Sequence, residues 1–400
     1  HAHWQIANMM AQTPERALEL METVWKPAIA RVEEEVTDMQ AIADRETGEA
    51  ADQKIVIEPW DYRYYAEKVR KEKYDFDGNE IKPYLQLDNL REALFYVADE
   101  VFGFQFQPVV PGSVPVPHPD VRVWEVRRGK AHVGLWYFDP FAREGKRSGA
   151  WMYPYRDQER FDGNITTLVS NNSNFVKGAP GEPVLVSWDD ASTLFHEFGH
   201  ALHGLSSNVS YPALSGTAVP RDYVEFPSQL LEYWLATPEV LNRFALHAET
   251  GKPIPAALVT RIERAATFNQ GFVTTEYLAS ALVDLKIHLA GGTDIDPSEF
   301  ERETLAELGM PREMVMRHRT PQFSHAFASE GYSAAYYSYL WADTLTADAA
   351  GAFTEGGGFY DKPVARRLED TIFATGNTID PAEAFRDFRG RDAQVGPLMK

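Results

Sequence analysis

Apolar residues recur every three or four positions at both ends of the chain, a spacing that is typical of amphipathic helices. Residues 13–39 begin with Thr13 and Pro14, a capping residue followed by a proline at the first helical position. Pro27 lies inside this stretch, and we expect it to kink the helix without ending it. Residues 88–103 have the same spacing, which predicts a second helix there.

The middle of the chain alternates apolar and polar residues instead, which predicts β-strands. Residues 121–138 alternate on both sides of Arg128 and Gly129, a pattern that predicts a hairpin. Two further short strands are predicted over 166–176 and 182–188. Helical spacing resumes after these strands and continues almost to the C-terminal end.

These patterns divide the chain into three consecutive segments. We expect a helical segment over residues 1–105, a small β-containing segment over 106–188 and a helical, metal-binding region over 189–400. Within the last region, Asp296 and Asp380 each precede a proline and mark two helix starts. The predicted fold is therefore mainly α, of the α+β class, with one small sheet.

The composition argues against several classes of protein. With 44% hydrophobic residues among 400, the chain can bury a substantial core, so we do not expect wholesale disorder. The formal net charge of −20 repels phosphate backbones, which argues against nucleic acid as a partner. The absence of cysteine excludes disulfides, thiolate metal ligands and cysteine nucleophiles.

Targeting and membrane signals are missing from the sequence. The apolar runs are too short to cross a bilayer, so we expect no association with membranes. No basic segment followed by an apolar one opens the chain, although an upstream targeting segment would not be visible in it. The absence of cysteine fits a reducing compartment, so we expect a cytoplasmic location, with the periplasm as the alternative. Because the chain begins at His1, we expect it to be a portion of a longer protein.

The strongest chemical signal is the sequence HEFGH at residues 196–200, inside the helix predicted over 190–202. Residues four apart lie on one face of a helix, so His196 and His200 can bind one tetrahedral cation. Zn²⁺ accepts nitrogen ligands well, and we predict one zinc ion per chain. Glu197 lies about 100° around the helix, where it can take a proton from water beside the ion without replacing a ligand.

The same five-residue motif also occurs by chance on unrelated helices, so its surroundings matter. His203 follows on the same stripe but is about 10 Å from His196 along the helix axis, too far to share the ion. We therefore expect His203 to have a supporting or structural role. Gly204 is expected to end the helix.

A zinc site with two histidines needs a third protein ligand and an open position. Glu225 stands 25 residues after His200 on a second predicted helix, and we predict that its carboxylate completes the site. Glu232 lies two turns later on the same face, where it can accept a hydrogen bond from a ligand imidazole. Asp222, one turn before Glu225, is the alternative for that role.

Several motifs resemble the thimet oligopeptidase (M3) family of zinc metallopeptidases. HEFGHALH and DYVEFPSQ begin at residues 196 and 222, and further motifs follow in the order of the family. The later segments are most similar to the peptidyl-dipeptidase branch, beside oligopeptidase A. They are HAF at 325–327, GY at 331–332, YYSYLWAD at 336–343, GNTIDP at 376–381 and FRGRD at 388–392.

The resemblance implies a zincin-like helical catalytic domain with a small β-sheet beside the metal helix. The three ligands and the general base identified above match those of the family. The resemblance also implies a group of residues that bind substrate and stabilise the transition state. In this sequence that group is His325, Tyr332, Tyr336 and Tyr339.

Tyr332, Tyr336 and Tyr339 are four and three residues apart, which predicts that they share one face of a helix. A tyrosine stripe at this spacing is ordinarily part of a core, and the resemblance is what favours the functional interpretation. Asn174 and Phe175 resemble the family's strand before the metal helix, and we expect an edge strand there that pairs with an extended peptide. An ordinary structural hairpin is the alternative.

The resemblance further implies hydrolysis of short, unstructured peptides with release of C-terminal dipeptides. A free carboxylate needs a cationic anchor, and the candidates are Arg317, Arg319, Arg386 and Arg389. Two alternatives are an oligoendopeptidase that cuts internally and an inactive peptide-binding remnant. Family members have an additional N-terminal region, so an N-terminal fragment of the same enzyme is a candidate partner besides short peptides.

Overall fold

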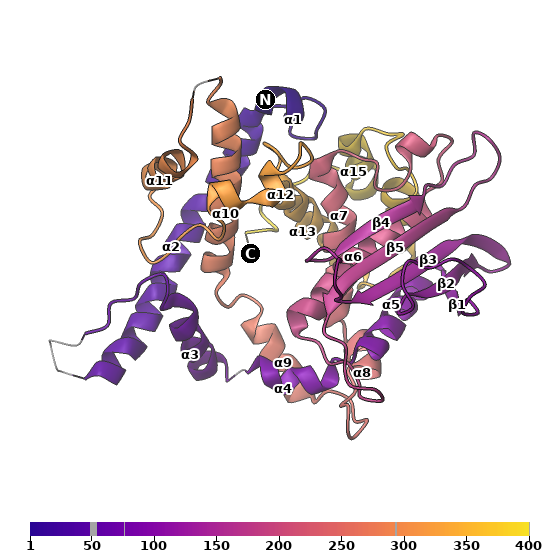
Figure 1. Cartoon of the computed structure of the whole chain (residues 1–400), viewed down its shortest axis with the longest axis horizontal. Helices are drawn as coiled ribbons and strands as arrows, with labels where there is room; N and C mark the ends of the chain where they lie inside the picture. Colours follow the sequence, from indigo (N-terminus) through magenta and orange to yellow (C-terminus); the bar gives the residue numbers. More distant parts are fainter. Residues whose placement is uncertain (49–53, 76, 293, 400) are drawn as a thin grey trace. The chain divides into compact units, whose positions relative to one another are not determined.

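The structure is a computed structural model, and the residues it describes are 1–48, 54–75, 77–292 and 294–399. They form helices and one small sheet, labelled in Figure 1. The predicted fold, mainly α with a small sheet, is therefore confirmed. Among the described residues, no helix combines the length and the apolar character that crossing a bilayer requires.

The chain divides into two compact units. Unit 1 comprises His1–Asp77 and Pro255–Trp341, and unit 2 comprises Gly78–Ile254 and Ala342–Lys400. Each unit combines two stretches that are distant in the sequence. The three consecutive segments expected from the sequence do not match these units, because long-range packing decides which stretches belong together and local patterns do not reveal it.

Unit 1 is helical. Its longest helix, α2 (Pro14–Thr47), begins as predicted, since the hydroxyl of Thr13 accepts a hydrogen bond from the N–H of Arg16 at 3.4 Å. Pro27 lies inside this helix and does not end it. The other helices that lie wholly in unit 1 are α1 (Ala2–Ile6), α3 (Tyr62–Tyr74), α9 (Ala256–Ala265), α10 (Gln270–Leu289), α11 (Pro297–Glu307) and α12 (Ser324–Phe327), with a 3₁₀ turn at Thr320–Gln322.

Helices α2 and α10 pack closely where α10 begins. A Cβ atom added at Gly271 would lie 2.7 Å from the backbone nitrogen of Val32, so glycine permits this approach. The buried carboxylate of Glu35 accepts hydrogen bonds from the N–H groups of Gly271 (2.8 Å) and Phe272 (3.0 Å). Glu35 therefore attaches the first turn of α10 to α2.

The sheet of unit 2 has five strands in the order β1-β2-β3-β5-β4. Neighbouring strands are antiparallel except β3 and β5, which run parallel. The predicted hairpin is confirmed, because β2 pairs with β3 and Arg128 lies opposite Ala131. The strands are β1 (Gln105–Pro108), β2 (Arg122–Arg128), β3 (Ala131–Phe141), β4 (Trp151–Arg156) and β5 (Thr167–Phe175).

Two helices of unit 2 carry the candidate site, α6 (Trp188–Ser206) and α7 (Arg221–Glu232). The others are α4 (Gly78–Ile81), α5 (Leu87–Phe102), α8 (Pro238–Phe244), α14 (Lys362–Leu368) and α15 (Pro381–Arg389). Helix α13 (Ser338–Gly356) begins in unit 1 and continues into unit 2. Short 3₁₀ turns occur at Lys82–Tyr84, Pro212–Leu214 and Tyr233–Ala236, and a π-helical turn at Glu369–Phe373.

The two aspartates predicted to start helices do so. Asp296 caps α11 and Asp380 caps α15, and each carboxylate accepts hydrogen bonds from two backbone N–H groups of the first turn. The stretch 182–188, in contrast, is not the predicted strand. It contributes only an isolated bridge between Leu185 and Gln86 before Ser187 caps α6.

Helix α6 continues past Gly204 to Ser206, so the prediction that Gly204 ends the helix is wrong. A Cβ atom added at Gly204 would lie 2.9 Å from Cγ1 of Val169 and 3.2 Å from Cε of Met152. The glycine therefore serves close packing of the helix on strands β5 and β4. Both a helix stop and a tight contact favour glycine, and local sequence does not distinguish them.

The predicted edge strand at Asn174 and Phe175 is also wrong. These residues end β5, an inner strand between β3 and β4, and the two edge strands of the sheet are β1 and β4. Strand β4 pairs with β5 over residues 168–172, just before these two residues. The side-chain amide of Asn174 donates to the carbonyls of Arg147 (2.8 Å) and Gly149 (2.7 Å) in the loop that leads into β4. Phe175 is buried. The loop after β3 places β4 outside β5, an order that the alternating pattern does not encode.

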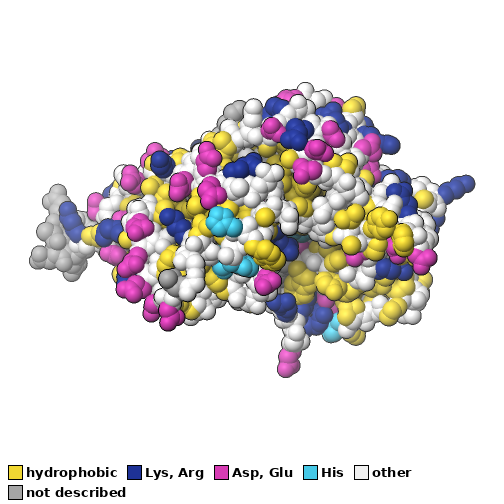
Figure 2. All heavy atoms as spheres, turned by 90° about the horizontal axis from the view of Figure 1, so that it is seen from above, with side chains coloured by type: hydrophobic (Ala, Val, Ile, Leu, Met, Phe, Trp, Pro, Cys, Tyr) yellow, Lys and Arg dark blue, Asp and Glu magenta, His cyan; other side chains and the backbone are white. Residues whose placement is uncertain are grey.

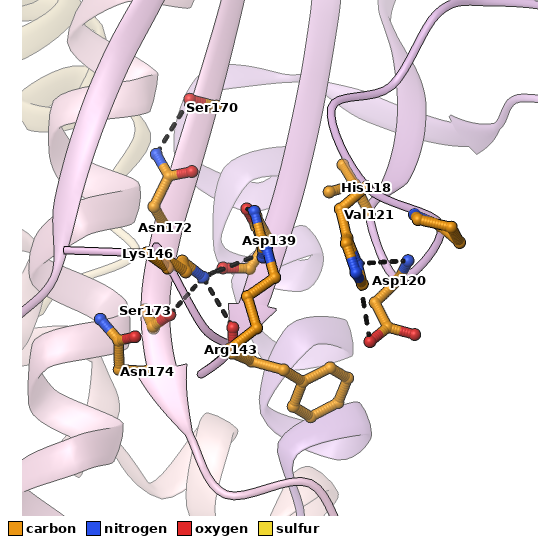
Figure 3. Close-up of polar contacts among 12 residues, drawn as sticks. His118, Asp120, Val121, Asp139, Arg143, Lys146, Ser170, Asn172, Ser173 and Asn174 are labelled. Carbon is orange, nitrogen blue, oxygen red and sulfur yellow. Dashed lines mark hydrogen bonds and ion pairs between the residues drawn. The ribbon is translucent and has the colours of Figure 1, made fainter. Parts of the chain in front are cut away.

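A buried cluster of charges holds this end of the sheet. Figure 3 shows Arg143 and Lys146 pointing toward Asp139, where β3 ends. Lys146 is only 3% exposed, and its ammonium also donates to the carbonyl of Ser173 in β5. All these groups are paired with one another or with the backbone, so the cluster fixes the loop and the two strands.

On one face of the molecule the acidic side chains are dispersed (Figure 2). On the face shown in Figure 2, acidic and basic side chains are interspersed, with hydrophobic side chains between them. The net charge of −20 is therefore not gathered into one patch on this face.

Candidate metal centre

Helices α6 and α7 approach each other closely at Gly199. A Cβ atom added there would lie 2.6 Å from Cα of Ser228 and 2.9 Å from the carbonyl oxygen of Pro227. Because Gly199 precedes His200 and Ser228 follows Glu225 by less than one turn, this contact brings imidazole and carboxylate within reach. The glycine of the motif thus determines the distance between the ligand-bearing helices.

His196, His200 and Glu225 form one group whose ligand atoms all lie within 4.8 Å of one another. Oε2 of Glu225 is 3.2 Å from Nε2 of His196 and 3.2 Å from Nε2 of His200. A tetrahedral zinc ion with N and O ligands at about 2.0–2.2 Å separates its donor atoms by about 3.3–3.5 Å. The spacing of these three donors therefore fits a zinc-sized ion.

Glu232 orients the first ligand. Its Oε1 lies 2.8 Å from Nδ1 of His196, which leaves Nε2 directed at the common point. Ser192 donates a hydrogen bond to the other oxygen of Glu232 at 2.9 Å. Asp222, the alternative from the sequence, is fully buried on α7. For His196, the structure therefore places Glu232 in the orienting position.

The charges of the group are complementary. Burial lowers the pKa of His196, but hydrogen bonds to Glu225 and Glu232 outweigh burial and hold that pKa well above its usual value. Burial raises the pKa of Glu225, but His200 and His196 outweigh it and hold that pKa well below the ordinary range. A carboxylate that stays ionised beside two imidazoles is ready to bind a cation.

Glu197 lies on α6 between the two ligand histidines and is 6% exposed. Burial raises its pKa, and the nearby His200 and His196 oppose that shift. Its Oε2 has no hydrogen-bond partner among the described residues, while the backbone N–H of Met152 in β4 also acts on the carboxylate. A buried carboxylate with a raised pKa and an unused oxygen is suited to proton transfer.

The structure adds two residues that the sequence analysis did not single out. Asn171 in β5 donates to the carbonyl of Glu197 at 2.5 Å and accepts from the indole N–H of Trp136 at 2.6 Å, so it attaches the metal helix to the sheet. Asp343 on α13 has a pKa raised to about 7, mainly by burial and then by Glu232. A polar residue inside a buried strand was the available signal for Asn171, and the YYSYLWAD motif contained Asp343.

His203 is not part of the ligand group. It is fully buried, and neither ring nitrogen has a hydrogen-bond partner among the described residues. Burial lowers its pKa to about 3, so it is a neutral imidazole packed beside Phe373. These observations agree with a structural role.

The residues His325, Tyr332, Tyr336 and Tyr339 form an aromatic cluster in unit 1. The rings of Tyr332 and Tyr339 stack at 5.7 Å, and those of His325 and Tyr332 are 4.6 Å apart. The hydroxyl of Tyr339 lies 3.3 Å from Nε2 of His325. The four side chains thus come together, in a unit other than the one that holds the metal ligands.

The tyrosines do not share a helical face, so that prediction is wrong. Helix α13 begins at Ser338, and Tyr332 and Tyr336 precede it in an irregular segment. Ala334 has a φ of +59°, which no right-handed helix allows. The cluster is assembled by the fold of this segment and not by helical spacing.

The four candidate carboxylate anchors differ in how strongly they are already engaged. Arg389 is bound to Asp348 and Glu355 and is 11% exposed. The remaining three pairs are Arg386 with Asp392, Arg319 with Glu301 at 2.7 Å and Arg317 with Glu276 at 3.8 Å. Arg317, whose side chain is 65% exposed, therefore has the loosest of these ion pairs.

Comparison with known proteins extends over the whole chain. Residues 1–400 match peptidase family M3. The chain is 39% identical to the dipeptidyl carboxypeptidase of Salmonella typhimurium and 38% identical to that of Escherichia coli, over 100% of this chain and 58% of each relative. It is 33% identical to oligopeptidase A of Salmonella typhimurium, again over 100% of this chain and 58% of the relative. The chain thus spans less than two thirds of these proteins, and it belongs to peptidase family M3.

Proposed function

We propose that this chain is the catalytic part of a zinc metallopeptidase that hydrolyses short, unstructured peptides and releases C-terminal dipeptides. The observation that carries the proposal is the convergence of three donor atoms, with Oε2 of Glu225 at 3.2 Å from Nε2 of both His196 and His200. Membership of family M3 and 38–39% identity to two dipeptidyl carboxypeptidases support the reaction.

In this proposal, His196, His200 and Glu225 hold one zinc ion per chain. A donor set of two imidazoles and one carboxylate is one that zinc accepts. When bound, zinc supplies a Lewis acid that polarises the scissile carbonyl and lowers the pKa of water. Glu232 holds the imidazole of His196 in the orientation that this requires.

Glu197 moves the proton. Its carboxylate takes a proton from the attacking water and delivers that proton to the leaving nitrogen of the peptide. Burial raises its pKa, which makes the carboxylate a stronger base than an exposed glutamate and its acid form usable near neutral pH. Asn171 and the N–H of Met152 keep the base in place from the sheet side.

The aromatic cluster of unit 1 supplies hydrogen-bond donors for the oxyanion. Tyr339, with Tyr332 or His325, is assigned this task on the resemblance to the family, and Tyr336 is assigned to substrate binding. The hydroxyl of Tyr339 and Nε2 of His325 lie 3.3 Å apart, so two groups that can each donate a hydrogen bond to a ligand are neighbours. Loss of one such donor typically lowers kcat by about 10²–10³-fold.

The substrate main chain is assigned to strand β4. This strand is an edge of the sheet, and the N–H of its residue Met152 acts on Glu197. An exposed edge can pair with an extended peptide, which recognises backbone without reading side chains. For the free C-terminal carboxylate, Arg317 is the least engaged of the four candidate arginines.

The second candidate function is cleavage within the peptide by an oligoendopeptidase. The 33% identity to oligopeptidase A favours it as the alternative. An inactive peptide-binding remnant is the third interpretation. The intact ligand group and the buried Glu197 count against it.

The test uses two quenched peptides of one sequence, one with a free and one with an amidated C-terminus. The zinc-loaded protein should release a dipeptide from the free peptide, and amidation should lower kcat/KM by at least about tenfold, since a charge-assisted hydrogen bond is lost. Equal cleavage of both peptides at an internal bond would instead establish the oligoendopeptidase.

The matched control is Glu197→Gln, which keeps the size of the side chain and removes the base. This variant should retain zinc and lose nearly all turnover. No turnover by the unmodified, zinc-loaded chain would leave only the peptide-binding remnant.

A further inference from the structure

Asp284 is a buried carboxylate of α10, 1% exposed, that belongs to no site described above. Its Oδ1 accepts a hydrogen bond from the N–H of Ala334 at 2.9 Å, and its Oδ2 accepts one from the N–H of Tyr336 at 3.1 Å. Each oxygen of one carboxylate thus binds one N–H on either side of Ala335. This carboxylate clamps the irregular segment that carries two tyrosines of the aromatic cluster.

The clamped segment is irregular, and its internal hydrogen bonds come from turns and from the hydroxyl of Ser333, which donates to the carbonyls of Ala326 and Ser329. Residues 328–337 form turns and no helix. Ala334 is held at a φ of +59°, a left-handed conformation that alanine rarely adopts. Such a conformation persists only where surrounding contacts enforce it, and the hydrogen bond from the N–H of Ala334 itself to Asp284 is such a contact.

A second residue of α10 supports the same segment further along. The hydroxyl of Tyr277, two turns before Asp284, donates to the carbonyl of Tyr336 at 2.6 Å and accepts from the N–H of Leu340 at 3.1 Å. The N–H of Leu340 lies in the first turn of α13, one residue after Tyr339. Helix α10 therefore binds the backbone before and after the tyrosines.

Asp284 also contacts a histidine of the same helix, His288. Nδ1 of His288 lies 2.8 Å from the backbone carbonyl of Asp284 and 3.0 Å from its Oδ1. The ring of His288 stacks on Phe327, which ends the short helix α12 that carries His325. The carboxylate of Asp284 thus binds the irregular segment 328–337 directly, and it is linked through His288 and Phe327 to α12.

We propose that Asp284 is a positioning residue for the aromatic cluster: its carboxylate holds the backbone so that Tyr332, Tyr339 and His325 stand in one arrangement. This inference rests on the proposed function only for its catalytic consequence, since the contacts all lie within unit 1. Donor groups must be held within a fraction of an ångström to act on a transition state, and a displacement of about 1 Å can cost about 10²-fold in rate.

The first experiment measures position without measuring activity. In the zinc-loaded protein, Asp284→Asn replaces one acceptor oxygen by an amide NH₂ that cannot bind an N–H. Hydrogen exchange should become at least about tenfold faster at the N–H of Ala334 or of Tyr336, whichever loses its acceptor oxygen. Unchanged exchange at both groups would overturn the proposal, whatever the activity of the variant.

The second experiment asks whether the effect passes through the tyrosines. Asp284→Asn should lower kcat about 10-fold or more and change KM less than threefold, with unchanged zinc content. In a Tyr339→Phe background, Asp284→Asn should lower the logarithm of kcat by less than half of the decrease that it causes in the parent protein. Full additivity of the two substitutions would show that Asp284 acts by another route.

Glu35→Gln is the matched control. Glu35 is also a buried carboxylate of unit 1 that accepts hydrogen bonds from two backbone N–H groups. It binds the first turn of α10, whereas Asp284 lies in the last two turns of that helix. Its substitution should be additive with Tyr339→Phe. If Glu35→Gln couples to Tyr339 as strongly as Asp284→Asn does, the effect is a general loosening of unit 1 and the proposal fails.

Tyr277→Phe keeps the proposal testable if Asp284→Asn does not fold. It removes one hydroxyl and should speed exchange at Leu340 while lowering kcat by about threefold or more. The catalytic role is a separate matter: if Tyr339→Phe and His325→Ala leave kcat unchanged, the proposed function of the cluster fails. Exchange at Ala334 and Tyr336 then still decides whether Asp284 holds the segment.

Discussion

The two units organise their chemical groups in opposite ways. In unit 2, His196 and His200 stand on the regular helix α6, and Glu225 stands on the regular helix α7. In unit 1, Tyr332 and Tyr336 stand on an irregular segment. The metal ligands take their directions from helices that hold their own shape. Tyr332 and Tyr336 take theirs from contacts with a neighbouring helix, whereas Tyr339 stands in the first turn of α13.

This difference determines how far a change in one residue spreads. A helix satisfies its backbone internally, so replacing a ligand on α6 or α7 removes one group and leaves the others in place. An irregular segment lacks that support, and its shape depends on partners such as Asp284. We therefore expect the effects of substitutions in unit 2 to be additive and the effects of substitutions around the tyrosines to be non-additive.

The largest effect is expected from Glu225→Ala, which removes one of three donors from the ligand group. Zinc content after dialysis should fall to a small fraction of one ion per chain, and turnover should fall by at least about 10³-fold. Hydrogen exchange in residues 325–339 should not change, since the cluster belongs to unit 1. The measurements are metal analysis and exchange on one sample.

The control for that variant is Glu239→Ala, which removes an exposed acid from α8 in the same unit. It should keep both zinc and activity. Full retention of metal by Glu225→Ala would refute the ligand assignment. Faster exchange in residues 325–339 would show that the loss of one metal ligand also changes the segment that bears the tyrosines.

A smaller effect is expected from Glu232→Gln. Gln keeps an oxygen that can accept from Nδ1 of His196, but it removes the negative charge that favours the imidazole orientation. Zinc affinity should fall by about 10–100-fold, which a competition with a chelator can measure. Ser192→Ala removes the hydroxyl that donates to Glu232. Its zinc affinity should lie between that of the parent protein and that of Glu232→Gln. Unchanged affinity in both variants would show that Glu232 does not orient the ligand.

The sequence predicts a residue's place best where spacing alone determines geometry. The ligand histidines, the base and the acidic residue 25 positions further on all lie on helices, where residue number specifies direction. Glu232 followed from the same rule. The helix caps at Asp296 and Asp380 were equally local, because a cap involves only neighbouring residues.

The sequence predicts least where contacts between distant segments decide the structure. Whether Gly204 ends a helix or packs against Val169 depends on a sheet formed by other residues. Whether β5 is an edge depends on where the chain lays β4. The tyrosine spacing suited a helix, but the hydrogen bond from Ala334 to Asp284, 50 residues away, stabilises a different shape. No local pattern contains these partners.

A pair of glycines tests the contrast between the units. Gly199 and Gly271 both sit where two helices approach within 2.6–2.7 Å of an added Cβ, in unit 2 and unit 1 respectively. Each substitution by alanine should destabilise its unit by about 1–3 kcal/mol, measured by chemical denaturation. Only Gly199→Ala should also weaken zinc binding, because it pushes α7 and Glu225 away from α6. Equal loss of zinc in both variants would mean that the units are not separate in this respect.

The smallest effect concerns two histidines with opposite surroundings, His203, which is fully buried, and His288, which is partly buried. His203 in unit 2 has no hydrogen-bond partner among the described residues, and burial lowers its pKa to about 3. For His288 in unit 1, burial lowers the pKa, but hydrogen bonds to Asp284 outweigh burial and the pKa is raised. Each histidine should therefore make stability depend on pH with its own sign.

The unfolded chain takes up a proton at each histidine near pH 6.5. Below that pH, folded His203 stays neutral, so unit 2 loses up to about 1.4 kcal/mol per pH unit until about pH 3. His288 does the reverse: its contribution is fully present below pH 6.5 and is lost as pH rises through its raised folded pKa.

In the zinc-free protein, whose ligand titration is common to all variants, His203→Leu should thus gain stability over the parent as pH falls from 7 to 5. His288→Gln should lose stability at pH 5 and approach the parent at high pH. Melting temperatures at several pH values give both differences. Parallel curves for the two variants would show that hydrogen bonding does not distinguish the histidines, because only a partner such as Asp284 makes a buried imidazole favour its charged form.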